Sequence, residues 1–379
     1  MSAPVPASRN AAIDHIRILL TALVVFHHVA IAYGGSGGWY FREQPNASNL
    51  LLVLFNATNQ SWFMGFFFLL AGYFTPPSVE RKGPARYAAD RLLRLGVPLL
   101  VYFFFISTFT IALARTHEGH ALWSGWAQMI REREFGPGPL WFAEALLLLA
   151  AGYLLWRRLH PAPAAKRHVI HDTSAAPRTP GLPSFRALAF TAVALGLVNF
   201  VVRLAIPVGQ DVLWLQLGYF PCYLWLFAAG CAASRSHLLE TVTFAQARPW
   251  LIVSALVAVT LPVLVVVQRG VGGFLGGWNL NALFYALWDP FVAAGAILGL
   301  LWFARTRWSR ATPLTAALAR SAFPAFIVHP PVAVACSLLA AGWTLPALAK
   351  FALVGMLATA GSFAVGGLLR AIPGAARIL

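Results

Sequence analysis

Two ionisable side chains near the start of the chain, Arg17 and His28, lie in one apolar segment at a spacing that could serve chemistry. In a helix this spacing brings them within about 20° of each other around the axis and about 16 Å apart along it. Asp14 falls within about 60° of both, whereas His27 is turned away by about 100°. We therefore predict one polar stripe that contains Asp14, Arg17 and His28, with a structural role for His27.

A carboxylate from a second apolar segment is expected to face this stripe. If the two segments cross a membrane in opposite directions, His28 and Glu144 both lie roughly 9 Å below its outer surface. A carboxylate beside an imidazole in a low-dielectric setting orients the ring and raises its basicity, as a general base requires. The sequence thus predicts a catalytic group of His28, Glu144 and Asp14, with His28 as the base.

Two further ionisable residues interrupt apolar segments: Asp289, and His329 within AFPAFIVHPP. An ionisable side chain inside a membrane span costs about 2.5 to 3.5 kcal/mol on insertion scales, so it needs a partner or a function. Neither residue has a compensating group nearby in the sequence. Both are expected to face the protein interior or a cavity, either as satisfied packing residues or as part of a site.

A pair of arginines, Arg91 and Arg94, stands one helical turn apart in the run GPARYAADRLLRLGVPLL. Two guanidinium groups at a membrane boundary suit the phosphates of a polyanionic cofactor such as coenzyme A. Basic residues also gather at such boundaries as ordinary topology anchors. The sequence alone leaves both interpretations open.

Membrane-spanning helices must position these residues. Of the 379 residues, 59% are hydrophobic and 11% are charged, whereas a soluble domain has about 25% charged residues. A helix needs roughly 20 apolar residues to cross the hydrocarbon core, and ten segments qualify. We therefore predict an all-α, polytopic integral membrane protein. The expected spans are residues 13–34, 50–74, 92–114, 138–156, 186–206, 213–233, 249–267, 281–303, 319–341 and 347–369.

The distribution of basic residues predicts the orientation of the spans. With the N-terminus inside, 20 of the 27 assignable Lys and Arg lie on the cytoplasmic side, as the positive-inside rule requires. Both termini are then cytoplasmic. The external side receives Arg42, Arg115, Arg131, Arg133, Arg203, Arg269 and Lys350.

No segment is polar enough to form a second folded domain, so residues 1–379 are expected to form one membrane domain. Residues 157–186, rich in Pro, Ala and charge, are expected to be a flexible cytoplasmic linker. The net charge of +16 does not indicate nucleic acid binding, because the arginines lie in short loops between apolar segments. The three cysteines are scattered in apolar segments, so neither a disulfide nor a metal site is expected.

Four of these features, in this order, resemble the acyltransferase-3 family, in particular its branch of bacterial membrane proteins that modify periplasmic glucans. They are Arg17 with His28 behind Ile13 and Asp14; FFFLLAGYF followed by Arg91, Arg94 and Pro98; PLWFAEALL with Trp141 and Glu144; and FIVHPP with His329. They fall in the first four expected spans and the ninth. FIVHPP departs from the double-histidine form of the glucan branch.

The resemblance implies an acyl-CoA-dependent acyltransferase of the bacterial inner membrane. Such an enzyme would move an acyl group, acetyl or succinyl, from cytoplasmic acyl-CoA to a hydroxyl of an external glycan, lipid-linked sugar or similar acceptor. The resemblance further implies His28 as the catalytic base and Arg17, Arg91 and Arg94 as contacts of the acyl-CoA, with no metal. The esterase-like periplasmic domain of some relatives is not expected.

Two other functions stay open at this point. A proton-coupled transporter could use Arg17, His28, Glu144 and Asp289 as a relay, although the sequence shows no paired repeats of the kind common in transporters. A non-catalytic membrane scaffold is the third alternative. For an enzyme, direct transfer is favoured over an acyl-enzyme intermediate because no serine or cysteine stands beside a base, while an acyl-histidine stays open.

Overall fold

The computed structural model describes residues 10–160, 181–268, 270 and 272–379, and this part of the chain is helical. Its only β-type pairing is an isolated bridge between Val212 and Leu215. Ten of the described helical stretches are long and apolar enough to cross a membrane. The predicted all-α fold with ten spans is therefore confirmed.

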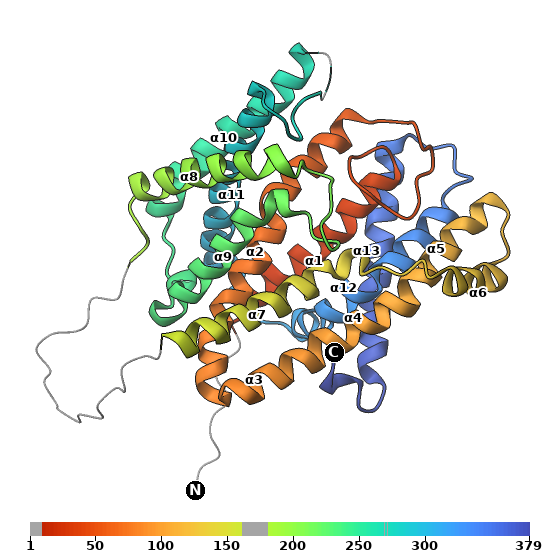
Figure 1. Cartoon of the computed structure of the whole chain (residues 1–379), viewed down its shortest axis with the longest axis horizontal. Helices are drawn as coiled ribbons and strands as arrows, with labels where there is room; N and C mark the ends of the chain where they lie inside the picture. Colours follow the sequence, from red (N-terminus) through yellow and green to blue (C-terminus); the bar gives the residue numbers. More distant parts are fainter. Residues whose placement is uncertain (1–9, 161–180, 269, 271) are drawn as a thin grey trace, which may run out of the picture.

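The spans follow one another along the chain as drawn in Figure 1. They are α1 (Ala11–Ala32), α2 (Leu50–Lys82), a composite third span (Pro84–Glu118) with α3 (Pro84–Arg91), α4 (Val97–Val101) and α5 (Ser107–Arg115), a fourth span (Gly138–Leu159) that includes α7 (Trp141–Leu159), α8 (Phe185–Ala205), α9 (Phe220–Ala233), α10 (Phe244–Val267), α11 (Leu280–Arg307), α12 (Pro313–Leu339) and α13 (Ala347–Ala371). One further helix, α6 (Leu122–Glu132), lies between the third and fourth spans. The predicted bounds agree within six residues, except where the second span ends and the third begins.

The second and third spans are longer than predicted. α2 continues through Pro76 and Pro77 to Lys82, and the third span begins directly afterwards at Pro84. The 33 residues of α2 correspond to about 50 Å of helix, against about 30 Å for the hydrocarbon core. Two π-helical turns, Leu92–Gly96 and Tyr102–Ile106, flank Pro98 in the third span. Pro98 has no N–H with which to continue the regular α-helical ladder.

Polar side chains explain where several helices begin. Asn10 accepts a hydrogen bond from the first turn of α1, and Asn49 and Asn279 cap α2 and α11 in the same way. Thr243 and Thr312 begin α10 and α12 with reciprocal capping boxes. Such caps satisfy backbone donors that have no partner within the first helical turn.

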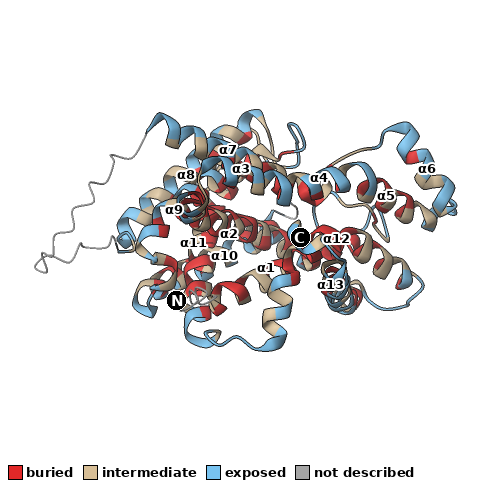
Figure 2. Ribbon diagram, turned by 90° about the horizontal axis from the view of Figure 1, so that it is seen from below, coloured by how far each residue is buried: buried red, intermediate tan, exposed pale blue. Residues whose placement is uncertain are grey.

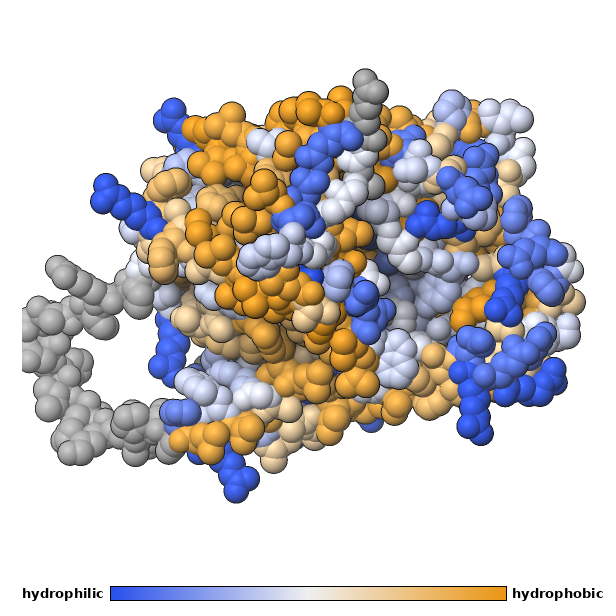
Figure 3. Space-filling model, turned by 45° about the horizontal axis from the view of Figure 1, so that its top comes forward, coloured by the Kyte–Doolittle hydropathy of each residue, from blue (hydrophilic) through white to orange (hydrophobic). Residues whose placement is uncertain are grey.

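The span that carries His28, Arg17 and Asp14 lies at the centre of the bundle. α1 packs against α2, α11, α12 and α13, and Figure 2 shows buried residues along α1, α2 and α12. Peripheral helices such as α8 and α10 expose apolar side chains, among them Val201 and Leu256. Figure 3 shows apolar side chains over much of one face and charged side chains toward its margins. This distribution suits a surface surrounded by lipid.

A close crossing of α2 and α9 depends on two glycines. Gly72 faces the backbone carbonyl of Phe227, and Gly230 faces the backbone carbonyl of Leu69. A Cβ atom at either glycine would collide with the backbone of the other helix. Small residues at such crossings let membrane helices approach closely.

Replacing Gly230 by leucine is expected to push α9 away from α2 and to lower the thermal unfolding temperature in detergent. Overpacking a tight interface typically costs about 1 to 3 kcal/mol. Gly152→Leu is the matched control, because a Cβ at Gly152 meets open space. Equal unfolding temperatures for the two variants would show that the crossing tolerates the added volume.

The predicted linker, residues 157–186, connects α7 to α8. α7 extends to Leu159, and residues 161–180 of the predicted linker lie outside the described residues. The assignment of the cytoplasmic face stays a prediction from the charge distribution.

Candidate active site

His28 lies in the last two turns of α1, and its ring lies nearly parallel to two other rings. The Trp39 ring, in the loop between α1 and α2, is 4.1 Å away between centroids with an interplanar angle of 13°. The His329 ring of α12 is 5.2 Å away with an angle of 19°. His28 is partly exposed as a residue, but its Nδ1 is buried without a hydrogen-bond partner among the described residues. The structure thus brings together two predicted site residues, His28 and His329.

The sequence around His329 determines which nitrogen of its ring carries the proton. Pro330 has no N–H, so the carbonyl of Phe326 cannot receive the usual helical hydrogen bond from four residues further on. The Nδ1–H of His329 donates to that carbonyl instead, at 2.6 Å. In a neutral ring the lone pair then belongs to Nε2. This Nε2 is buried and has no hydrogen-bond partner in the described part of the chain.

His27 points away from this group, as the helical phase predicts. Its Nδ1 lies 3.4 Å from the amide nitrogen of Asn59, and its ring stacks on Phe63 at 5.2 Å between centroids. The side chain of Asn56 donates to the backbone carbonyl of His27 at 2.9 Å. These contacts join α1 to α2, so His27 serves packing between the two helices.

The loop that carries Trp39 is fixed by the next residue, Tyr40. The hydroxyl groups of Tyr40 and Tyr102 share a hydrogen bond at 2.9 Å. Burial raises the pKa of Tyr40 above its ordinary value, so this hydroxyl keeps its proton. Gly138, with a φ of +45°, packs against both tyrosines where a Cβ would collide with them. The third and fourth spans therefore position the loop and its tryptophan.

Arg17 lies toward the opposite end of α1 from His28. Its guanidinium is 3.5 Å from the carboxylate of Asp14 and lies over the ring of Phe74 at 4.8 Å. The helical rise between Asp14 and His28 amounts to about 21 Å. Asp14 therefore lies too far from His28 to assist it directly, and its partner is Arg17.

Arg91 and Arg94 lie near the same end of the bundle as Arg17. The guanidinium of Arg91 lies over the ring of Tyr87 at 5.1 Å. The hydroxyl of Tyr87 is 3.2 Å from the hydroxyl of Thr75. Thr75 is the residue after Phe74, whose ring lies under Arg17. Arg91 is partly exposed and Arg94 is exposed. Arg17 and Arg91, from two spans, thus lie near the same part of α2, and Arg94 lies one helical turn beyond Arg91.

Trp141 and Glu144 lie in the first turn of α7. Trp141 stacks on Tyr223 of α9 at 6.0 Å between centroids, so it belongs to the aromatic packing between these helices. Glu144 is partly exposed, and within the described residues neither a hydrogen bond nor an ion pair joins it to His28. The expected pairing is absent because α7 packs mainly against the third span, whereas α1 packs against α2, α12 and α13.

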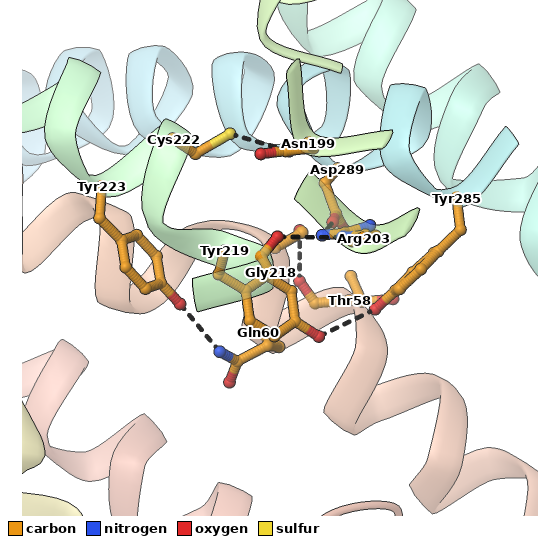
Figure 4. Close-up of polar contacts among 11 residues, drawn as sticks. Thr58, Gln60, Asn199, Arg203, Gly218, Tyr219, Cys222, Tyr223, Tyr285 and Asp289 are labelled. Atoms are coloured by element: carbon orange, nitrogen blue, oxygen red, sulfur yellow. Dashed lines mark hydrogen bonds and ion pairs between the residues drawn. The ribbon is translucent and has the colours of Figure 1, made fainter. Parts of the chain in front are cut away.

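Asp289 has a partner that the sequence analysis missed. Arg203 of α8 donates to its carboxylate at 2.5 Å, and both side chains are buried (Figure 4). Arg203 also donates to the carbonyl of Gly218 at 3.0 Å and lies over the rings of Tyr219 and Tyr285. Asp289 has no partner nearby in the sequence, as expected, and a distant residue satisfies it as a packing residue. The expectation that Arg203 contributes to the external surface is wrong, because Arg203 lies buried inside α8. α8 packs against α11, and this contact brings the two charges together.

Comparison with known proteins identifies the family of this chain. The model of a family described as an acyltransferase domain matches residues 10–367, nearly the whole chain. The chain belongs to the acyltransferase-3 family. With its ten candidate spans, it is a membrane acyltransferase of that family.

Two curated relatives of this acyltransferase-3 protein carry the same name. The glucans biosynthesis protein C of Escherichia coli strain K12 is 34% identical over 97 residues, and that of Escherichia coli O1:K1 / APEC is 33% identical over 97 residues. Each match covers 26% of this chain and 24% of the relative. No solved structure matches the chain.

Proposed function

We propose that this protein is an O-acyltransferase of the bacterial inner membrane that uses cytoplasmic acyl-CoA. It transfers an acetyl or succinyl group to a hydroxyl of a glycan, lipid-linked sugar or similar acceptor on the external side. The position of His28 carries the proposal. A partly exposed imidazole at the centre of the bundle, packed by Trp39 and His329, lies about 16 Å along the same helix from Arg17.

The donor binds at the arginine end of α1. Arg17, Arg91 and Arg94 bind the phosphates of coenzyme A, because guanidinium groups form strong charge-assisted hydrogen bonds with phosphate. The pantetheine arm then extends along α1 toward His28. The contacts of Arg17 with Phe74 and of Arg91 with Tyr87 leave both cations close to one part of α2, which supports a shared polyanionic ligand.

The acceptor binds at the His28 end. Its hydroxyl gives a proton to the Nε2 of His28 and attacks the thioester carbonyl. A new C–O bond forms, the C–S bond breaks, and the proton passes from His28 to the sulfur of the departing coenzyme A. The name of the curated relatives, glucans biosynthesis protein C, supports a glucan as the first acceptor to test.

The test is coenzyme A release by the purified protein in lipid nanodiscs. Acetyl-CoA and succinyl-CoA are each supplied with and without a glucan oligosaccharide. The proposal predicts release of free thiol that depends on the acceptor, together with acylated oligosaccharide detected by mass spectrometry. Thiol release that does not depend on any hydroxyl acceptor, or no thiol release at all, would contradict the proposal.

Replacing Arg91 or Arg94 by alanine is expected to weaken acyl-CoA binding. A hydrogen bond to a charged group is worth about 1.5 to 3 kcal/mol, so each change should raise the Kd about 10- to 100-fold. Arg86→Ala is the matched control, because Arg86 is an exposed arginine of the same helical segment. Unchanged acyl-CoA affinity in both variants would identify Arg91 and Arg94 as topology anchors.

A further inference from the structure

Two neighbouring histidine rings each carry a buried nitrogen without a hydrogen-bond partner among the described residues. These atoms are the Nδ1 of His28 and the Nε2 of His329. The rings are nearly parallel, 5.2 Å apart between centroids. A buried polar atom without a partner is destabilising. One water molecule between two adjacent rings can satisfy both atoms at once.

The two nitrogens are chemically complementary. The Nδ1–H of His329 donates to the carbonyl of Phe326, which leaves its Nε2 as an acceptor. A neutral His28 that carries its proton on Nδ1 is a donor toward that acceptor. The other nitrogen of His28, Nε2, then carries a lone pair. Unlike Nδ1, it is not one of the buried side-chain atoms that have no hydrogen-bond partner.

We propose that His329 is the positioning residue for the proposed catalytic base. Its Nε2 accepts a hydrogen bond from a water molecule that in turn accepts from the Nδ1–H of His28, and this bridge presents the His28 Nε2 lone pair to the acceptor hydroxyl. The inference rests on the proposed function and adds the group that orients the base. During transfer the acceptor proton moves to the Nε2 of His28 and then to the sulfur of coenzyme A, while His329 keeps its own proton on Nδ1.

The other candidates for this role are placed less well. Glu144 has no hydrogen bond or ion pair with His28 within the described residues. His27 meets His28 edge-on at 89°, and its Nδ1 is already next to Asn59. Trp39 covers one face of the His28 ring at 4.1 Å, which restricts rotation of the ring but offers no acceptor, because the indole N–H only donates.

Two substitutions at position 329 separate positioning from packing. His329→Leu removes the acceptor and is expected to lower kcat about 10- to 100-fold, the usual effect of losing the partner that orients a functional histidine. His329→Gln retains an acceptor oxygen and is expected to recover most of that loss. The KM for acyl-CoA should stay unchanged in both. Ser321→Ala, at a buried serine of the same helix that donates to Ala317, is the control and should keep the wild-type kcat.

A double variant tests whether His329 acts through His28. The single variant His28→Ala is expected to keep a residual rate about 10² to 10⁴-fold below that of the wild type. In this background the change His329→Leu is expected to cause no further loss of that residual rate. An additional loss there, a leucine variant with wild-type kcat, or a glutamine variant as slow as the leucine variant would overturn the positioning role. If His28→Ala abolishes transfer while His329→Leu does not, the proposed function stands and this inference fails.

The tautomer of His28 gives a readout that does not depend on activity. Solid-state NMR of protein labelled with ¹⁵N-histidine should show His28 with its proton on Nδ1, assigned by comparison with His28→Ala. The same tautomer should persist in His329→Gln and be lost in His329→Leu. A His28 ring protonated on Nε2 in the wild-type protein would overturn the inference even if transfer is observed.

Discussion

Replacing His28 by alanine is expected to abolish acyl transfer while the protein stays folded and still binds acyl-CoA. Loss of a general base typically lowers a rate about 10² to 10⁴-fold. Binding should persist because the proposed phosphate contacts, Arg17, Arg91 and Arg94, lie at the opposite end of the bundle from His28. The measurement is the rate of coenzyme A release in nanodiscs, alongside the Kd for acyl-CoA.

His27→Ala is the matched control for this experiment. Its ring packs on Phe63 and Asn59 and is turned away from the proposed acceptor side, so most of the activity per folded molecule should remain. A lower unfolding temperature is expected, because the variant loses buried contacts between α1 and α2. If the His27→Ala variant is inactive in acyl transfer and the His28→Ala variant is active, the proposed catalytic face of α1 is wrong.

Breaking the buried pair of Arg203 and Asp289 is expected to have the largest effect on stability. Arg203→Ala leaves a buried carboxylate next to Tyr219 and Tyr285 without its cation. Removing one partner of a buried ion pair typically costs about 3 to 5 kcal/mol. The free energy of unfolding, measured in mixed micelles, should fall by that amount, and the expression level in membranes should fall with it.

Two controls separate the buried charge from the loss of side-chain volume. The double variant Arg203→Met with Asp289→Leu removes both charges and is expected to recover most of the stability, since apolar replacements of buried pairs are often neutral. Arg235→Ala breaks an exposed contact with Glu80 at 3.8 Å and should change little. A stable Arg203→Ala variant, or a double variant as unstable as the single one, would contradict a role for the pair in stability.

The spans were predictable because each one needs a continuous apolar stretch, and this requirement is local in the sequence. The predicted bounds were wrong where a helix continues beyond the hydrocarbon core. α2 runs through Pro76 and Pro77 to Lys82, since a helix that leaves the hydrocarbon no longer needs apolar residues. The charge pattern assigns Arg203 to the external side, because a cation near a span end looks like a topology anchor. Its partner, Asp289, is 86 residues away in the chain.

The candidate site was only partly predictable. Helical phase correctly separated His27 from His28, because both lie on one regular helix. The neighbours of His28 depend on which helices pack against α1, and sequence spacing does not encode that choice. The prediction from sequence spacing therefore missed Trp39, which lies in a loop. It also paired His28 with Glu144 instead of His329. The proline directly after His329 was the available signal, because Pro330 frees the Phe326 carbonyl that orients this ring.

Sealed proteoliposomes can show whether the acyl group is transferred across the membrane. A glucan oligosaccharide is enclosed inside, and ¹⁴C-labelled acetyl-CoA or succinyl-CoA is added only outside. We expect labelled oligosaccharide inside the vesicles with the wild-type protein and none with His28→Ala. Labelled oligosaccharide at equal levels with His28→Ala, or product only when donor and acceptor share one side, would contradict the proposed function.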